Sequence, residues 1–442
     1  MKRKMVTRRV FMKEGAAAFV GIGSAFVLPH FLIRAAYAAM PEGSTPDAKR
    51  KTLIVLFQRG AADGLSMVIP FAEDMYYNVR PTISVPLPLA GVSNGAIDLD
   101  GFFALHPALA PFKDLYDGQH LAIVHAAGSP DSTRSHFDAQ DFMETGTPGD
   151  KTTIDGWLNR YLLARKLDAE KKESPFRAVA LGQRLPRILQ GEFPAVSMPS
   201  IEAFDVQGGG SSRGPAQTGQ ARAHSMSSGF EAMYAQGVQD LLYGTGRETF
   251  DAVKMLRAAN PAKFEPDNGA VYPRGAFGDA LKQIAQLIKS DIGLEIAFAD
   301  SGGWDTHANQ GGIQGQLAIN LRSFSQGIAA LHRDLGDRMN DVVIVTLSEF
   351  GRTVRENGNR GTDHGHANAI FVLGGGVKGG KVYGRWPGLS SGQLHEGRDL
   401  AITTDFRDVL GEIVSRHLGL SELSGVFPGH EGNTLNFRGI MG

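Results

Sequence analysis

The 442-residue sequence contains no cysteine. This absence excludes disulfide bonds, thiol nucleophiles and thiolate metal sites, so the fold must be stabilised by its own core. Neither sign of charge is in excess, because 45 Lys and Arg stand against 46 Asp and Glu. The sequence also has no short repeat, and 42% of its residues are apolar, so collagenous, coiled-coil and disordered chains are excluded.

The N-terminus has no apolar run long enough to span a membrane. Its apolar stretch, Gly15–Leu28, has 14 residues, whereas a bilayer span needs about 20. The stretch follows the basic segment Thr7–Lys13, which contains two adjacent arginines, and precedes an Ala-x-Ala pattern at Ala36–Ala38. We therefore expect residues 1–38 to be a twin-arginine signal peptide rather than a retained anchor. The twin-arginine translocase would export the folded chain, and the mature protein would be periplasmic or secreted.

The mature chain is expected to be acidic. Removing residues 1–38 takes away seven Lys and Arg but one acidic residue, which leaves 38 basic and 45 acidic residues and a net charge of −7. Such a chain is a poor candidate for binding nucleic acid. Residues 39–50 are polar and contain two prolines, which predicts a linker before a domain over 51–442.

The rest of the sequence predicts an α/β fold. Continuous apolar runs rich in β-branched residues alternate with helical patterns, which is typical of a mostly parallel central sheet with helices on both faces. The predicted strands are 52–57, 121–125, 177–181, 294–299, 342–347 and 369–373. The predicted helices are 136–144, 157–166, 230–243, 277–290, 315–335 and 404–418. An irregular insertion is expected around 182–223, with an exposed Gly- and Ser-rich loop at 206–220.

Polar residues gather directly after the predicted strands, where ligands bind in open α/β sheets. Asp, Glu or His, usually with Gly, occurs in each of these loops, which are 58–64, 128–136, 300–307 and 348–352, and again in the segment 361–368. Several carboxylates in one cleft repel each other unless a cation compensates them. Carboxylates and imidazoles are ligands of Zn²⁺, Mn²⁺, Mg²⁺ and iron, so the pattern predicts a metal site with more than one ion.

The candidate ligands differ in how strongly their setting supports a metal. Asp363, His364 and His366 form the densest cluster, with three ligand-type residues in four positions. Alternate positions of an extended segment share one side, so Asp305 and His307 suit a ligand pair, although an Asx turn would also explain them. Glu349 follows a buried strand, where a charge needs a partner. Asp63 precedes a glycine and is equally a turn residue.

Ser135 lies at the start of a predicted helix and admits two interpretations. Its hydroxyl can cap the helix by accepting a backbone N–H. A helix N-terminus also favours anions, so the same hydroxyl could meet a phosphate as a nucleophile. Arg59, Arg134 and Arg352 could clamp a phosphate or sulfate, or lie on the surface.

Several segments together resemble an exported family known as domain of unknown function 1501. These segments are LFQRGAADGLSMVIP, LHPALAPFKDLY, STRSHFDAQDFMETG, GGWDTHANQ, TLSEFGRT and GTDHGHANAIFVLGGGVKGGKVYG. The resemblance runs from about Thr52 to the end of the sequence. That family is similar to the alkaline phosphatase and sulfatase superfamily, which implies an alkaline-phosphatase-like three-layer sandwich. It also implies two divalent ions (Zn, Mn, Mg or Ca) and hydrolysis of a small-molecule or polysaccharide phosphate or sulfate ester.

The resemblance implies roles for particular residues. Asp63 matches a ligand of one metal, and Asp305 and His307 match an Asp–His pair on the other. Glu349 stands where the superfamily has an Asp, and Phe350 stands where it has a His. Either one metal is bound more weakly, or Asp363 and His364 complete the site, with His366 or His364 as the last His ligand. The residues that match the nucleophile and its helpers are Ser135, with Ser132 and Thr133 as rivals, and Arg134 and Arg352.

Two further functions remain open beside the hydrolase. Phe350 and the uncertain nucleophile also fit a non-catalytic binding or assembly protein on the same scaffold, since a fold does not determine a function. A metal-dependent mutase of the same superfamily is the other alternative. A sulfatase with a Cys-derived formylglycine is excluded, because the sequence has no cysteine.

Overall fold

The computed structural model describes residues 50–88, 94–165, 174–204, 252–430 and 436–442. The predicted signal peptide, the linker up to residue 49, the loop 206–220 and the helix 230–243 lie outside these ranges. Among the described helices, none combines the length and the apolar character that crossing a membrane requires.

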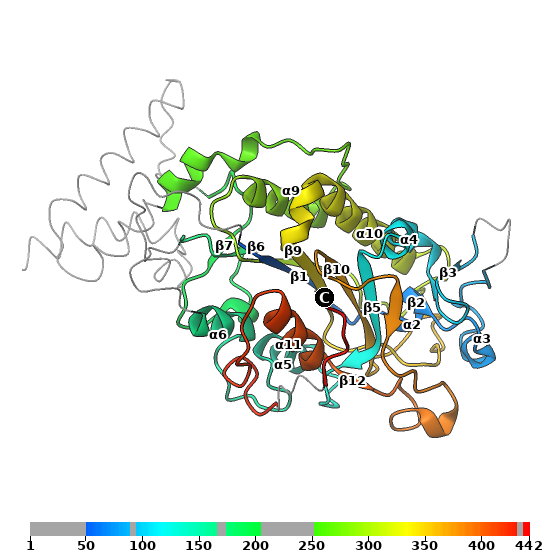
Figure 1. The fold of residues 1–442 in the computed structure, drawn as a ribbon. Coiled ribbons are helices and arrows are strands. Elements are labelled where there is room, and N and C mark those ends of the chain that lie inside the picture. Colours follow the sequence, from blue (N-terminus) through cyan, green and yellow to red (C-terminus); the bar gives the residue numbers. More distant parts are fainter. Residues whose placement is uncertain (1–49, 89–93, 166–173, 205–251, 431–435) are drawn as a thin grey trace, which may run out of the picture.

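A nine-stranded sheet forms the centre of the molecule (Figure 1). Eight strands lie in the order β11-β5-β10-β9-β1-β8-β6-β7, and β12 pairs with β5. Every pairing is parallel except the two made by β10, which runs against β5 and β9. The strands are β1 (Thr52–Gln58), β5 (Leu121–Gly128), β6 (Ala178–Leu181), β7 (Val196–Met198), β8 (Ile296–Ser301), β9 (Val342–Leu347), β10 (Asn368–Gly374), β11 (Lys381–Tyr383) and β12 (Thr404–Asp405).

Helices cover both faces of this sheet, which makes a three-layer α/β sandwich. One layer contains α4 (Ala110–Asp117), α9 (Ala276–Lys289) and α10 (Gln316–Leu335), and the other contains α5 (His136–Thr145), α6 (Trp157–Ala164) and α11 (Phe406–Arg416). Strand β1 contributes side chains to the cores under both helix layers, because successive side chains of a strand point to opposite faces. Ile54 and Leu56 join the core under the first layer, while Leu53, Val55 and Phe57 join the core under the second.

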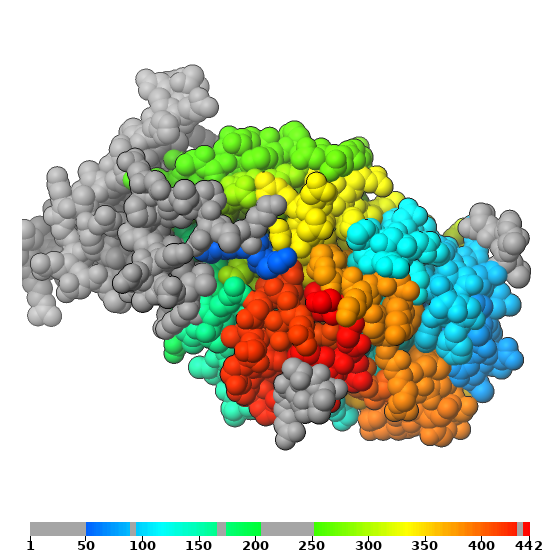
Figure 2. All heavy atoms as spheres, in the orientation of Figure 1, coloured from blue at the N-terminus to red at the C-terminus, as the bar shows by residue number. Residues whose placement is uncertain are grey.

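Shorter elements lie beside the sandwich. The helices α2 (Gly64–Met67) and α3 (Asp74–Val79) accompany a small antiparallel sheet of β2 (Val68–Ile69), β4 (Ala104–Leu105) and β3 (Ile97–Asp98). The segment that follows β11 packs on this part, since Glu73 accepts hydrogen bonds from the Trp386 indole at 2.7 Å and from the Leu389 amide at 2.6 Å. In Figure 2 the two segments form one continuous surface.

The predicted fold class and the six predicted strands are confirmed. Their buried, β-branched runs occupy the middle of the sheet, where both faces are covered. Several features were not predicted, among them the small sheet β2-β4-β3, the strands β11 and β12 and the helix α4. Strand β7 lies inside the expected irregular insertion and extends the sheet beside β6, but its three residues are too few to give a pattern. The reversed direction of β10 is a tertiary property that an apolar run does not specify.

Buried histidines outside the candidate site make the stability of this fold dependent on pH. Burial lowers the pKa values of His125 and His417 to about 4 from 6.5. The unfolded chain therefore binds more protons below pH 6.5, so the free energy of unfolding should fall between pH 6.5 and 4, by about 3 kcal/mol per imidazole at most. Urea denaturation at a series of pH values measures this fall. His125→Gln should flatten the pH dependence, and an unchanged slope in that variant would contradict the assignment.

Candidate metal centre

The candidate site lies at the edge of the sheet where the parallel strands end. Strands β1, β5, β8 and β9 finish there, and β10 begins there because it runs in the opposite direction. This topology explains how distant segments meet. The segments that meet at this edge are Gly60–Asp63, Arg134–His136, Asp305–His307, Glu349–Arg352 and Asp363–His366.

Glycines allow the backbones of these segments to touch. Gly60 has a φ of +116°, and a Cβ there would lie 2.7 Å from the amide nitrogen of Asp305. A Cβ on Gly361 would lie 2.4 Å from the carbonyl carbon of His307, and one on Gly365 would lie 2.3 Å from that of Arg352. Glycine is therefore required where the loops pack backbone against backbone.

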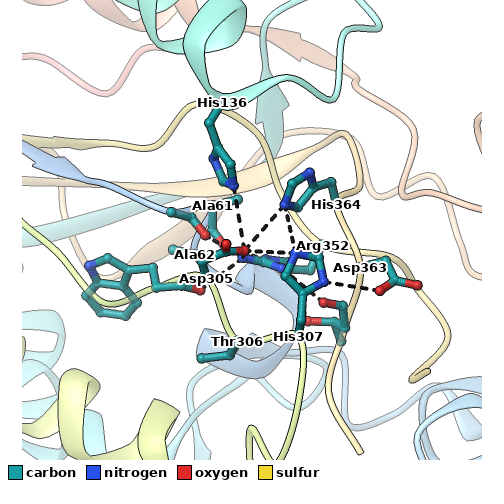
Figure 3. Close-up of polar contacts among 12 residues, drawn as sticks. Ala61, Ala62, His136, Asp305, Thr306, His307, Arg352, Asp363 and His364 are labelled. Atoms are coloured by element: carbon teal, nitrogen blue, oxygen red, sulfur yellow. Dashed lines mark hydrogen bonds and ion pairs between the residues drawn. The ribbon is translucent and has the colours of Figure 1, made fainter. Parts of the chain in front are cut away.

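One carboxylate oxygen lies at the centre of the site. Oδ1 of Asp305 is 3.0 Å from Nε2 of His307, 3.3 Å from Nε2 of His364 and 3.6 Å from Nε2 of His136. Figure 3 shows the three imidazoles pointing at this oxygen from different directions. The Asp305 side chain is 48% exposed, so solvent and ligands can reach the cluster.

Glu349 fixes the orientation of His136. Its Oε1 lies 2.8 Å from Nδ1 of the imidazole and also accepts from Gln140 at 2.8 Å and from the Gly60 amide at 2.9 Å. A carboxylate accepts hydrogen bonds, so in the neutral ring Nδ1 of His136 carries the hydrogen and Nε2 presents a lone pair. This Nε2 is buried and has no hydrogen-bond partner among the described residues.

The other two imidazoles are held in the same way. Nδ1 of His364 lies 2.8 Å from the Arg134 carbonyl, and Nδ1 of His307 lies 3.2 Å from Oδ1 of Asp363. Both acceptors direct the Nε2 lone pairs to the centre, where the two Nε2 atoms are 2.9 Å apart. Two lone pairs at this distance repel unless a proton or a cation lies between them.

The donor set and its spacing fit a divalent cation. Zn–N and Zn–O bonds of about 2.0–2.2 Å in a tetrahedron place neighbouring ligand atoms about 3.3 Å apart. Four of the six separations among these atoms, 2.9, 3.0, 3.3 and 3.6 Å, lie around this value, while the group whose atoms are all mutually close is His136, Asp305 and His364, without His307. Within the described part of the chain, the ligand atoms of His136, Asp305 and His364 all lie within 4.8 Å of one another, and His307 adjoins two of them.

The charges of the cluster also favour a cation. Asp305, Glu349 and Asp363 contribute three negative charges, and Arg352 contributes one positive charge at 2.6 Å from Oδ1 of Asp305. With neutral imidazoles the formal sum is −2, which one divalent ion balances.

The pKa shifts of Asp305 and His364 agree with this arrangement, whereas that of His136 favours its protonated ring, so a cation would have to displace a proton there. Burial alone would raise the pKa of Asp305, but the hydrogen bond and charge of Arg352 outweigh it, and the pKa lies below its usual value. Burial, together with nearby positive groups, lowers the pKa of His364, which favours its neutral ring. The hydrogen bond to Glu349 raises the pKa of His136.

Arg352 connects the loops of the site through hydrogen bonds. Its side chain is fully buried, and it donates to the carbonyls of Gly60, Ala61, Trp304 and Thr362 as well as to Asp305. Because the guanidinium is fully buried, an external phosphate or sulfate does not reach it, and the contacts favour a role in positioning Asp305.

Asp63 lies beside the site but does not join the cluster. Its Oδ2 accepts from Arg80 at 2.7 Å and from Gln310 at 2.7 Å, and both charged side chains are buried. Burial alone would raise the pKa of Asp63, but the charge and hydrogen bond of Arg80 hold it below the usual value. The geometry gives Asp63 a structural ion pair.

Two other predicted residues also have partners of their own. The ring of His366 stacks on that of His395 with centroids 4.1 Å apart, rather than pointing at Asp305. Ser135 caps α5, because its Oγ accepts from the Asp138 amide at 3.5 Å. Its side chain is exposed, as is that of Ser132, while Thr133 is half-buried and its Oγ1 accepts from the Ser135 amide.

Phe350 takes part in the packing of the site. Its ring is buried, and its centroid lies 5.1 Å from that of His136 and 5.0 Å from that of His364. The ring of Phe350 therefore packs against two of the three imidazoles. The superfamily that the sequence resembles has a His at this position.

Sequence reasoning missed His136 and Gln140. His136 was part of the polar loop after the second predicted strand, but we assigned the chemistry of that loop to its neighbour Ser135. His136 is the first residue of α5, and the first turn of this helix faces the ends of the strands. This position could have indicated that its side chain reaches the site. Gln140 follows one helical turn later on the same face, where it supports Glu349.

Comparisons with known proteins support the family but not a specific activity. A family model described as "Protein of unknown function (DUF1501)" matches residues 124–426. No curated protein matches the sequence.

Two solved structures are similar at low identity. One is Ps i-CgsB in complex with k-i-k-neocarrahexaose (TM-score 0.38, 10% identity, 86% of this chain and 74% of that chain). The other is the PsFucS1 sulfatase from Pseudoalteromonas sp. (TM-score 0.36, 12% identity, 84% of this chain and 68% of that chain). Both TM-scores are below 0.5, and the function proposed below rests on the side chains of the site.

The structural ion pair of Asp63 can be tested against the metal role that the resemblance implies. Asp63→Ala leaves a buried Arg80 without its counter-charge, so we expect a loss of about 3–5 kcal/mol in the free energy of unfolding. The variant should retain the Zn²⁺ affinity of the unaltered protein under conditions where it is folded. Urea denaturation and titration calorimetry measure the two quantities. A large loss of Zn²⁺ affinity with unchanged stability would instead favour Asp63 as a ligand.

Proposed function

The chain belongs to the DUF1501 family, and we propose that it is a metal-dependent hydrolase of phosphate or sulfate esters. The observation that carries this proposal is the convergence of three imidazole Nε2 atoms on Oδ1 of Asp305 at a solvent-accessible edge of the sheet. We also propose that residues 1–38 direct export through the twin-arginine translocase, so that the site would work in the periplasm or outside the cell.

His136, His307, His364 and Asp305 would hold the cation. Three neutral imidazoles and one carboxylate suit Zn²⁺, Mn²⁺ or iron, whereas Ca²⁺ and Mg²⁺ prefer oxygen ligands. Glu349 and Asp363, which we predicted as ligands, would orient His136 and His307 through their Nδ1 atoms instead. The described residues support one cation site, and a second ion would need ligands beyond this set.

Ser135 remains our proposed nucleophile because its neighbours anchor it at the cluster. The carbonyl of Arg134 accepts from His364, and the side chain of His136 points at Asp305. The Ser135 hydroxyl is exposed at the N-terminus of α5, where free backbone N–H groups and the helix dipole favour an anionic ester. When bound, the cation would lower the pKa of a nearby hydroxyl and neutralise the charge of the ester oxygens.

The two arginines would act through charge and position. Arg352 holds Asp305 and four loop carbonyls, so it keeps the ligand set assembled before a substrate arrives. The guanidinium of Arg134 is paired with Glu396 and Asp399, and its carbonyl orients His364. Both contribute positive charge beside the site, but the guanidinium of Arg352 is buried, and Nε and Nη2 of Arg134 are already paired with carboxylates.

Metal binding tests the proposed ligand set. We expect the metal-free protein to bind Zn²⁺ in titration calorimetry, and we expect His136→Ala and His364→Ala to weaken binding at least 100-fold, because each removes a directly coordinating nitrogen. His366→Ala is the matched control, since His366 belongs to the same segment as His364 but stacks on His395. An equal loss in all three variants would contradict the assignment.

Hydrolysis tests the proposed nucleophile. The Zn²⁺- or Mn²⁺-loaded protein should cleave aryl phosphates or aryl sulfates, and Ser135→Ala should lower kcat at least 100-fold while metal affinity stays unchanged. Ser132→Ala should retain activity. Full activity in Ser135→Ala would remove this nucleophile from the mechanism.

One observation favours a second candidate function. The Ser135 hydroxyl already caps α5, and Arg352 is fully engaged, so the site could bind a cation without carrying out hydrolysis. A protein that binds Zn²⁺ tightly but cleaves neither class of ester would support this non-catalytic binding role.

A further inference from the structure

Asp399 is a buried carboxylate that the proposed reaction does not use. It is completely buried, and its Oδ2 accepts from Nη2 of Arg134 at 2.6 Å and from Nε of the same residue at 3.2 Å. The backbone of Asp399 is also held, because it forms isolated antiparallel bridges with Thr353 and His395. This buried carboxylate therefore hydrogen-bonds to the guanidinium of Arg134 through Oδ2, while its Oδ1 lies 3.7 Å from Nε of Arg398 in a second, longer ion pair.

The backbone carbonyl of Arg134 connects this ion pair to the candidate metal centre. Its carbonyl oxygen lies 2.8 Å from Nδ1 of His364 and so determines which ring nitrogen of that residue carries the hydrogen. Next to Asp399, Arg398 donates to the carbonyl of His364 at 2.8 Å. The segment around Asp399 therefore restrains His364 at its ring, through Arg134, and at its backbone, through Arg398.

We propose that Asp399 is a positioning residue that acts through Arg134 to hold the His364 imidazole with its Nε2 facing Asp305. This inference rests on the proposed function, because it assigns a partner to a proposed ligand. Residues beyond the ligands that fix their tautomer typically contribute a factor of 10–100 to metal affinity. Asp399 acts one contact further away, so we expect the lower end of this range.

Glu396 provides a matched control within the same network. It accepts from the same Nη2 of Arg134 at 2.7 Å, but its side chain is 55% exposed, whereas that of Asp399 is buried. An exposed carboxylate is solvated and positions its partner weakly. Removing its charge should therefore leave His364 in place.

The experiment compares Asp399→Asn, Arg134→Gln, the double variant and Glu396→Gln in the full chain. We expect Asp399→Asn and Arg134→Gln each to weaken Zn²⁺ binding about 10-fold in calorimetry. The double variant should bind no more weakly than the worse single variant, because both changes interrupt the same series of contacts from Asp399 through Arg134 to His364. Glu396→Gln should stay within about twofold. Additive losses, or wild-type affinity in a folded Asp399→Asn variant, would overturn the proposal.

A second measurement separates this inference from the proposed function. Nitrogen-15 NMR of the imidazoles in the metal-free protein should show His364 with its hydrogen on Nδ1, and a mixture of tautomers in Asp399→Asn. If the unaltered protein binds no Zn²⁺, the proposed function fails, and this tautomer shift still decides the role of Asp399. If Asp399→Asn does not fold, the same NMR shift in Arg134→Gln decides it, and an unchanged tautomer there would overturn the proposal.

Discussion

The structure depends on one electrostatic constraint, which is that three imidazole lone pairs and three carboxylates share a small space. Nε2 atoms of His307 and His364 only 2.9 Å apart, facing Asp305, are unfavourable without positive charge between them. Arg352 supplies one positive charge, and the remaining formal charge of −2 matches a divalent ion. The chemistry that we propose follows from this imbalance.

The fold meets this constraint by holding the ligands before any ion binds. Glycines let the loops touch, and the Arg352 guanidinium joins four loop carbonyls, so the ligands come from rigid and closely packed backbone. Each imidazole has its Nδ1 on an acceptor, which fixes its tautomer. Prepared ligands lose little conformational entropy on binding, and this favours high affinity.

The sequence predicted the architecture and the sheet edge at which the polar loops meet, because both follow from local patterns. Buried β-branched runs marked the strands, and the polar residues after them marked the edge where parallel strands end. It predicted Asp305, His307 and His364 as the ligands that we still propose, but not the contacts of Asp63, Glu349 and His136, since these depend on tertiary partners. Arg80 neutralises Asp63 from 17 residues away, and Glu349 bonds to the far nitrogen of His136. No pattern in the sequence distinguishes such an orienting carboxylate from a ligand.

Anomalous X-ray diffraction from crystals grown with Zn²⁺ tests the central claim most directly. The account predicts a strong peak at about 2.0–2.2 Å from Nε2 of His136, His307 and His364 and from a carboxylate oxygen of Asp305. A peak at another group of residues, or crystals saturated with Zn²⁺ that show no peak among these four side chains, would contradict it.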